Sequence, residues 1–134
     1  MKTRNMNRKQ GFTIIELMIV LVIVAILLAL AYPSYVQYVR KGKRGDAQQA
    51  LMNWAVNQEI WRSNHTSYAT TGELPVGNLD HYILQMSGNP TATSYILQAV
   101  AQNDQAKDKA RDGTLCTTLS LNQNGQKLPA ACWE

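Results

Sequence analysis

Glu16 is a carboxylate inside an apolar run, FTIIELMIVLVIVAILLALA, which covers residues 12 to 31 and contains no other charged side chain. An unpaired carboxylate within a bilayer costs at least about 2.5 kcal/mol, and ionisable residues at such positions generally have a function. The chemistry open to this group is ion pairing, because a nearby opposite charge favours the ionised form. Glu16 therefore predicts a cationic partner.

Cys116 and Cys132 are the two cysteines of the chain, and both lie near its C-terminus. Their spacing does not match a zinc site, which usually takes four nitrogen or sulfur ligands. Because the chain has the features of an exported protein, a disulfide is the better interpretation. Closing a loop of this length contributes roughly 3 kcal/mol in the chain-entropy model. Two unrelated buried thiols are the alternative.

The remaining titratable residues do not form a catalytic motif. His65 and His81 are too far apart in sequence for a local metal-binding motif. No serine or aspartate lies in a signature that would place it beside a histidine base, and there is no glycine-rich phosphate loop. We therefore expect both histidines at the surface, in a protein that is not an enzyme and uses no cofactor or metal.

A segment of alternating charge, QAKDKARD, lies at residues 105–112. Its cations are Lys107, Lys109 and Arg111, and aspartates at 104, 108 and 112 are interleaved with them. DNA binding favours a basic stripe that is not neutralised by neighbouring acids. The interleaving therefore favours a solvated loop, with DNA contact by the three cations as the sharper alternative.

The formal net charge of +4 comes from the first eleven residues. Four of the thirteen basic residues lie there, which leaves nine basic and nine acidic residues in the rest of the chain. Without that segment the chain is formally neutral, so net charge is no argument for nucleic acid. A second basic segment, RKGKR at 40–44, is predicted to be a solvated face, with lipid headgroup contact as the alternative.

The apolar run is predicted to form a membrane-spanning helix, because twenty helical residues span about 30 Å, the thickness of a bilayer's hydrocarbon core. Basic residues flank the run on both sides, and the preceding group lies nearer, which places the N-terminus inside. A conventional signal peptide is the alternative. Against it, the run is long and no A-x-A-like cleavage site follows it directly.

A proline and a second helical segment follow the run. Pro33 lacks an N–H and clashes with the preceding turn, so we expect a kink or a locally weakened helix, with a loop as the alternative. Gly42 and Gly45 disfavour helix by roughly 1 kcal/mol each. Beyond them, one stripe recurs at three- and four-residue steps: Ala47, Ala50, Leu51, Trp54, Gln58 and Trp61. This spacing predicts a helix that packs one face on a sheet.

Three short strands are predicted in the C-terminal half, at residues 81–86, 94–101 and 117–123. The turn-rich stretch 63–80 is predicted to be a connecting loop. Asn124-Gly125 indicates a tight turn, and a fourth strand from Gln126 is kept short by Pro129. The predicted fold is α+β: a long N-terminal helix, membrane-spanning in its first half and amphipathic in its second, packed on a small antiparallel β-meander.

The stretch KQGFTIIE resembles the class III leader of type IV pilins and related pseudopilins. In that family a short basic leader ends in glycine, phenylalanine follows, and a glutamate comes four positions later; Gly11, Phe12 and Glu16 match. The resemblance implies that a prepilin peptidase cuts between Gly11 and Phe12 and methylates the new amine. It also implies that Glu16 meets the Phe12 amine of a neighbouring subunit during assembly. The alternative is that Glu16 pairs with its own N-terminus or lies among the headgroups.

The C-terminal stretch CTTLSLNQNGQK…CW resembles small minor pilins of the PilE type, which implies a disulfide region containing Cys116 and Cys132. In pilins, a proline at the distance of Pro33 from the cleavage site lies in a stretch that can lose helical structure in the filament. The organisation this implies is a cleaved leader at 1–11, a hydrophobic transmembrane and assembly helix at 12–39, and a globular pilin head at 40–134.

The function this resemblance implies is that of a structural subunit, a minor pilin, in a type IV pilus that supports adhesion, twitching motility or DNA uptake. The expected partners are other pilin subunits, the prepilin peptidase, an inner-membrane assembly platform, the membrane before assembly, and DNA as a further candidate. The head would lie in the bacterial periplasm before assembly and outside the cell in the pilus. A pseudopilin of a type II secretion system and a DNA-uptake receptor stay open as alternatives.

Overall fold

The computed structural model of the chain describes residues 11–134. All but the last residue of the expected leader therefore lies outside the described residues. One long helix, α1 (Ile14–Arg62), is followed by four strands and two short 3-10 helices. The chain divides into two compact units, of which the first ends at Tyr35 and the second begins at Val36. We refer to the second unit, Val36–Glu134, as the head.

The first unit consists of the N-terminal half of α1, whose start is capped by a side chain. The backbone N–H of Glu16 donates to the Thr13 hydroxyl oxygen at 3.2 Å, which satisfies one of the free donors at the helix N-terminus. Pro33 lies inside the helix, and helical structure continues on both sides of it. The alternative of a loop that ends the helix at this point is therefore wrong.

The second half of α1 buries one face in the core of the head. Ala47, Leu51, Trp54 and Gln58 are buried and recur at three- and four-residue steps, which confirms the predicted stripe. The amide of Gln58 fixes the connecting loop, because it donates to the Ala69 carbonyl at 3.0 Å and accepts from the Ala69 N–H at 2.9 Å. The polar member of the stripe is thus fully satisfied.

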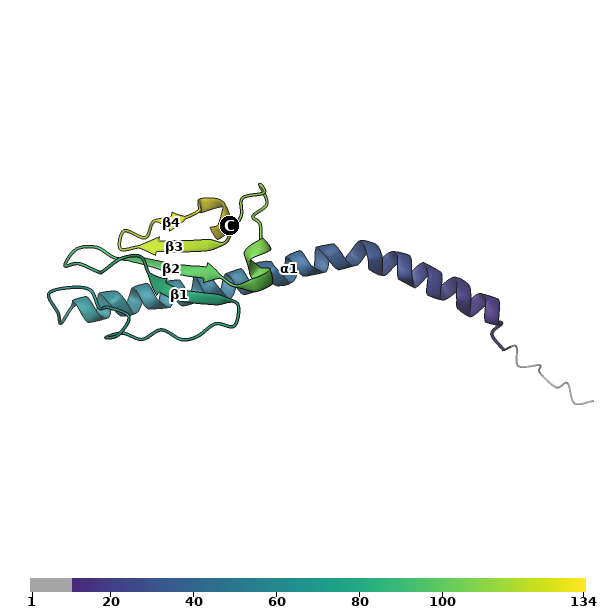
Figure 1. The fold of residues 1–134 in the computed structure, drawn as a ribbon, viewed down its shortest axis with the longest axis horizontal. Coiled ribbons are helices and arrows are strands. Elements are labelled where there is room, and N and C mark those ends of the chain that lie inside the picture. The colour runs from purple at the N-terminus through teal and green to yellow at the C-terminus, as the bar shows by residue number, and fades with distance from the viewer. Residues whose placement is uncertain (1–10) are drawn as a thin grey trace, which may run out of the picture. The chain divides into compact units, whose positions relative to one another are not determined.

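Four antiparallel strands form a sheet in the order β1-β2-β3-β4: β1 (Tyr82–Met86), β2 (Ile96–Ala101), β3 (Thr118–Asn122) and β4 (Lys127–Leu128). In Figure 1 the sheet runs along the C-terminal half of α1. Leu119 and Leu121 of β3 alternate inward, as predicted. β4 is short, and Gly125 has φ +73° in the turn before it, a conformation that glycine adopts without strain. The predicted α+β fold is confirmed.

The C-terminus is tied to both layers of the head. A disulfide joins Cys116 to Cys132, which lies in the second 3-10 helix (Ala130–Trp133). The Gln48 side chain on α1 donates to the Cys132 carbonyl at 2.6 Å. The disulfide that the sequence favoured over two free thiols is therefore present, and it attaches the tail to the start of β3.

The connection between β2 and β3 is more ordered than expected. Its first part is a 3-10 helix, Asn103–Lys107, and an isolated bridge pairs Lys109 with Leu115. Gln105 and Asp108 are buried, although the segment was expected to be a solvated loop. That expectation holds for the exposed Lys107 and fails for Asp108, because Asp108 has a buried partner on α1.

Candidate functional site

The start of α1 brings together the residues of the Gly-Phe junction. Gly11 and Phe12 precede the helix, and the Phe12 side chain is 81% exposed. Thr13 and Glu16 have the T-x-x-E spacing of a capping box, which is a local signal for the start of a helix. Glu16 is exposed, so its carboxylate is free to meet a group from outside the chain.

The apolar half of α1 is uncovered within the chain. Its large side chains, from Phe12 to Leu30, are all at least 44% exposed. By length and composition, α1 is the one helix in the described part of the chain that is able to cross a membrane. Apolar surface of this extent requires lipid or another protein to cover it.

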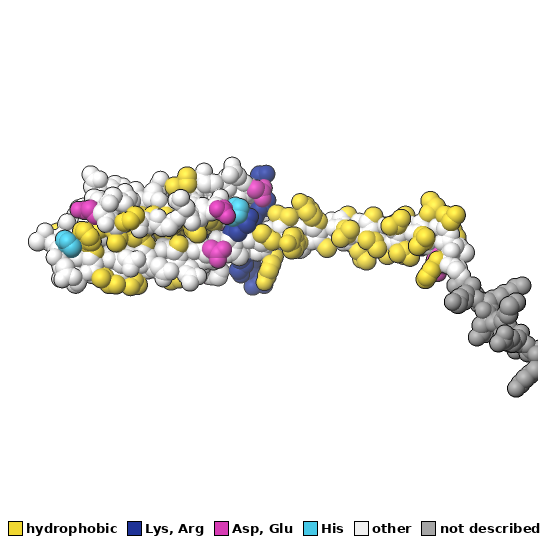
Figure 2. Space-filling view, turned by 90° about the horizontal axis from the view of Figure 1, so that it is seen from below, with side chains coloured by type: hydrophobic (Ala, Val, Ile, Leu, Met, Phe, Trp, Pro, Cys, Tyr) yellow, Lys and Arg dark blue, Asp and Glu magenta, His cyan; other side chains and the backbone are white. Residues whose placement is uncertain are grey.

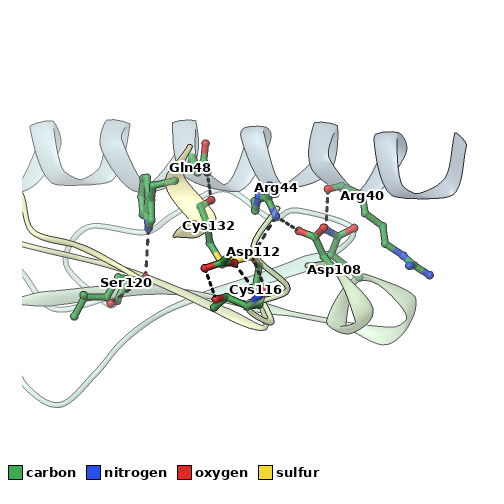
Figure 3. The surroundings of a disulfide bond; sticks show 12 residues. Arg40, Arg44, Gln48, Asp108, Asp112, Cys116, Ser120 and Cys132 are labelled. Carbon is green, nitrogen blue, oxygen red and sulfur yellow. Dashed lines mark hydrogen bonds and ion pairs between the residues drawn. A yellow bond between two sulfur atoms is a disulfide. The ribbon is translucent and has the colours of Figure 1, made fainter. Parts of the chain in front are cut away.

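A buried ion pair connects α1 to the β2–β3 connection. The Arg44 guanidinium donates to the Asp108 carboxylate at 2.9 Å, and the two side chains are 4% and 1% exposed. The same Arg44 nitrogen lies 3.1 Å from the Cys116 sulfur, so ion pair and disulfide share one site (Figure 3). The expectation that residues 40–44 form a solvated face is therefore wrong for Arg44, whose charge is held in the interior.

The electrostatics of this site are set by burial. Loss of water raises the pKa of the Asp108 carboxyl above its ordinary value, and Arg44 opposes this shift by favouring the ionised form. One carboxylate oxygen, Oδ1, is buried without a hydrogen-bond partner. Breaking the pair would leave a buried charge without compensation, which is why such pairs strongly constrain the segments they join.

A second pair lies one turn earlier on α1. Arg40 donates to Asp104 at 2.8 Å, and this hydrogen bond is the main reason that the pKa of the Asp104 carboxyl is lowered. The Gln105 amide donates to the Arg40 carbonyl at 2.9 Å. Two polar links from α1, through Arg40 and Arg44, therefore hold the β2–β3 connection in place.

This arrangement decides which charges of the alternating segment at 105–112 are exposed to solvent. Lys107, Lys109 and Arg111 are exposed, whereas Asp108 between them points inward. The charges of the connection and of the two α1 arginines that pair with it are five basic and three acidic: Arg40, Arg44, Lys107, Lys109 and Arg111 with Asp104, Asp108 and Asp112. The excess is 5 − 3 = 2 positive charges. Figure 2 shows Lys and Arg side chains gathered at one end of the head.

In the described part of the chain, neither histidine belongs to a group of candidate metal ligands. The ring of His65 stacks on Trp61 with a centroid distance of 3.8 Å, and its Nδ1 lies 2.9 Å from the Trp61 carbonyl. His81 lines a shallow surface pocket with Lys43 and Asp80. Within residues 11–134, no three His, Cys, Asp or Glu side chains are grouped so that they could hold a metal ion.

Two family models match the chain and together cover most of it. Residues 6–32 match the prokaryotic N-terminal methylation motif. Residues 33–120 match the family described as "Type IV minor pilin ComP, DNA uptake sequence receptor". The chain belongs to this type IV pilin family. Together with its long helix, four-stranded sheet and C-terminal disulfide, this makes it a structural pilus subunit.

Individual relatives agree with this assignment. The chain is 25% identical to fimbrial protein EcpC of Eikenella corrodens over 92% of its own length and 90% of that protein. It is 33% identical to prepilin peptidase-dependent protein D of Escherichia coli (strain K12), over 61% of this chain and 59% of that one. A type IV pilin structure from Shewanella oneidensis superposes with a TM-score of 0.57 and 29% identity, covering 71% of this chain and 98% of that one.

Proposed function

We propose that the pilin is made as a membrane-anchored precursor, cut between Gly11 and Phe12 by a prepilin peptidase, methylated on the new amine, and passed to an inner-membrane assembly platform. The organisation would be leader 1–11, transmembrane and assembly helix 12–39, and head 40–134, with the head in the periplasm until assembly. The supporting observation is an uncovered apolar helix that starts directly after a Gly-Phe junction and carries one carboxylate.

Glu16 has a specific role in this proposal. Cutting before Phe12 places a cation four positions from Glu16, and in an apolar filament core such a pair favours a defined docking geometry. Glu16 would receive the Phe12 amine of a neighbouring subunit, and Pro33 would lie in a stretch that loosens during assembly. Burial of the apolar segment against other pilins drives the association, and the ion pair sets its register.

The test compares Glu16→Ala with Thr13→Ala in cells that assemble pili. We expect both variants to insert in the membrane, but only Glu16→Ala to be depleted, by about tenfold or more, in sheared filaments. Thr13→Ala removes the helix cap, so it controls for loss of helix stability, about 1 kcal/mol at a cap. Equal amounts of Glu16→Ala and wild type in sheared filaments would refute the docking role.

Processing is tested by the intact mass of the protein from sheared filaments, before and after reduction. We expect a chain that begins at N-methylated Phe12 and gains the mass of two hydrogen atoms when its one disulfide is reduced. A chain that still carries residues 1–11 would refute cleavage at Gly11. Processed protein in cells but not in filaments would favour the pseudopilin of a type II secretion system.

DNA uptake is a second candidate function, because the matching family is described as a DNA uptake sequence receptor. The exposed cations Lys107, Lys109 and Arg111 lie on a connection that two ion pairs hold to α1, and these pairs engage two of its three aspartates, Asp104 and Asp108. Each phosphate contact that these residues make would release counterions, so the affinity would fall steeply with salt.

The DNA candidate is tested by duplex binding at several salt concentrations. Replacing all three cations with glutamine should weaken binding and reduce the slope of log K against log salt by roughly 3. Lys127→Gln, a single cation on β4, is the control and should change the slope by at most about 1. If the triple variant bound DNA with the same salt dependence as wild type, the DNA-binding site would have to lie elsewhere on the head.

A further inference from the structure

β1 lies at one edge of the sheet, and part of its backbone faces away from β2. In the described part of the chain, β2 is the only strand that pairs with it. The carbonyl of His81, just before β1, accepts from the Gln102 N–H at 2.9 Å. The Ser87 N–H, just after β1, donates to the Ile96 carbonyl at 2.9 Å. Because backbone hydrogen bonds alternate along an antiparallel strand, positions 83 and 85 also bond to β2, whereas positions 82, 84 and 86 face the free edge.

Two residues of this edge, Leu84 and Met86, have backbone groups without a partner. Tyr82 pairs with Leu79 of the preceding loop in an isolated bridge. Continued antiparallel from there, the loop would place Pro75 opposite Met86, and proline has no N–H to donate. Among residues 11–134, the outward backbone groups of Leu84 and Met86 accordingly make no hydrogen bond. Free N–H and C=O groups on an edge strand are a template for another extended chain.

The loop before β1 leaves two pockets beside this edge. The loop runs along β1 in Figure 1, and Val76 of the loop and Leu84 of β1 line both pockets. The first, of about 250 Å³, reaches α1, and the second, of about 310 Å³, reaches the end of β1. None of the described side chains that line the two pockets is charged. We call the two pockets together the edge slot; its lining includes Asn53, Asn57, Val76, Leu84 and Met86.

Asn53 and Asn57 on α1 add hydrogen-bonding groups to the slot at a matching spacing. The amides of Gln48 and Gln58 on the same helix bond to carbonyls of the head, whereas neither asparagine side chain bonds to another described residue. Each asparagine amide offers both a donor and an acceptor. Four helical residues rise about 6 Å, and two residues of an extended chain advance about 6.7 Å. The two amides therefore recur at nearly the step of the main-chain groups of an extended peptide, as do the free groups of β1.

We propose that the edge slot binds an extended, uncharged peptide segment of a partner protein, which joins the sheet as a further strand beside β1. Leu84 and Met86 would pair with one edge of the segment, and the amides of Asn53 and Asn57 would bond to its other edge. A charged residue in the segment would lose water without gaining an opposite charge from the slot, so an uncharged segment is favoured. Because the contacts are to the main chain, many sequences of that kind should fit. The inference goes beyond the filament role and does not depend on cleavage after Gly11.

The first test measures binding of a short capped peptide of alternating threonine and valine to the purified protein in detergent. We expect wild type to bind it, and to bind the same peptide with methylated backbone nitrogens at least about tenfold more weakly, because the methyl groups block main-chain hydrogen bonds. Asn53→Leu/Asn57→Leu should cause a similar loss without destabilising α1, because leucine is the better helix former. Gln49→Leu is the matched control: it changes an exposed amide of α1 that lines neither pocket, and it should bind like wild type.

The second test locates the bound peptide by hydrogen exchange. In its presence the N–H groups of Leu84 and Met86 should exchange about tenfold more slowly, whereas those of Ile83 and Gln85, already bonded to β2, should change little. No binding of the peptide, equal binding of its methylated form, or unchanged exchange at Leu84 and Met86 would overturn the proposal. So would slow exchange at Leu84 without peptide, which would mean that the chain's own loop occupies the edge. Binding of a neutral sugar oligomer, maltohexaose, in place of the peptide would make the slot a saccharide site instead.

Discussion

At the residue scale, the buried pair of Arg44 and Asp108 has the largest structural consequence. It joins α1 to a segment 64 residues later in the chain, and it also contacts the disulfide through Arg44. Since Asp108 is turned inward, the neighbouring Lys107 and Lys109 are turned outward. The orientation of the candidate DNA-binding cations thus depends on an acid that the sequence shows only as one member of an alternating charge pattern.

Removing one partner of this pair should destabilise the head more than removing both. Asp108→Ala leaves the Arg44 charge buried and should lower the free energy of unfolding by about 3–5 kcal/mol. Arg44→Met/Asp108→Leu replaces both charges with apolar groups and should recover most of that loss. Urea unfolding of the processed protein in detergent measures both values. A double variant as unstable as Asp108→Ala would contradict this account.

Tyr95 should make the head sensitive to alkaline pH. Burial, with a smaller effect of Glu59, raises the pKa of Tyr95 from 10.0 to about 12. The unfolded chain therefore ionises first, and stability that is present below pH 10 is lost as the pH rises toward 12. The loss is about 3 kcal/mol, at about 1.4 kcal/mol for each unit of pKa shift.

The variant Tyr95→Phe isolates this effect. Its free energy of unfolding should fall less steeply between pH 10 and 12 than that of wild type, whereas below pH 9 the two pH profiles should run parallel. Urea titrations across this pH range give the comparison. Identical slopes in the two proteins up to pH 12 would show that Tyr95 does not ionise differently on unfolding.

At the element scale, the disulfide holds the end of the chain to β3. Cys116 and Cys132 are 16 positions apart, and a loop of that length corresponds to about 3 kcal/mol of stabilisation. Cys116→Ser/Cys132→Ser should lower the free energy of unfolding by this amount. Hydrogen exchange in the variant should quicken first at β4 and at residues 130–133. Unchanged exchange there would mean that the Gln48 contact alone holds the tail.

The elements were predictable where hydrophobic periodicity specifies them. Steps of three and four residues indicated the buried face of α1 from Ala47 to Gln58, and alternation at Leu119 and Leu121 indicated β3. The pair of Arg44 and Asp108 could not be predicted from periodicity, because neither residue is apolar and the two lie 64 positions apart in the sequence. In a local sequence pattern, a charged residue that is buried in the fold cannot be told from a charged residue at the surface.

The proposed assembly site depends on a local pattern in the same way. The spacing of Gly11, Phe12 and Glu16 is local, and residues 6–32, which include all three, match the methylation motif. Met52, Val56 and Ile60 of α1 are apolar but exposed, and local spacing alone does not separate them from the buried apolar residues on the other face of the helix. The distinction needs the position of the sheet, since only the sheet decides which of the two faces is buried.

At the scale of the whole molecule, removal of the leader would bring the chain to formal neutrality, with nine basic and nine acidic residues. Polymers of a protein without net charge have little electrostatic repulsion between them. Sheared filaments should therefore associate laterally most strongly near pH 7 and separate at pH 4 and at pH 10. Light scattering and sedimentation across this range test the expectation, and scattering that does not vary with pH would contradict it.

The sheet of the head ends in an edge that offers little to a further strand. β4 has two residues and is followed by Pro129, which has no N–H, while the Trp133 indole donates to the Leu128 carbonyl at 3.3 Å. Subunits crowded in a membrane before export therefore lack, on this side, the template on which amyloid grows. A filament of this protein therefore has to be held together by contacts other than strand pairing at this edge of the sheet.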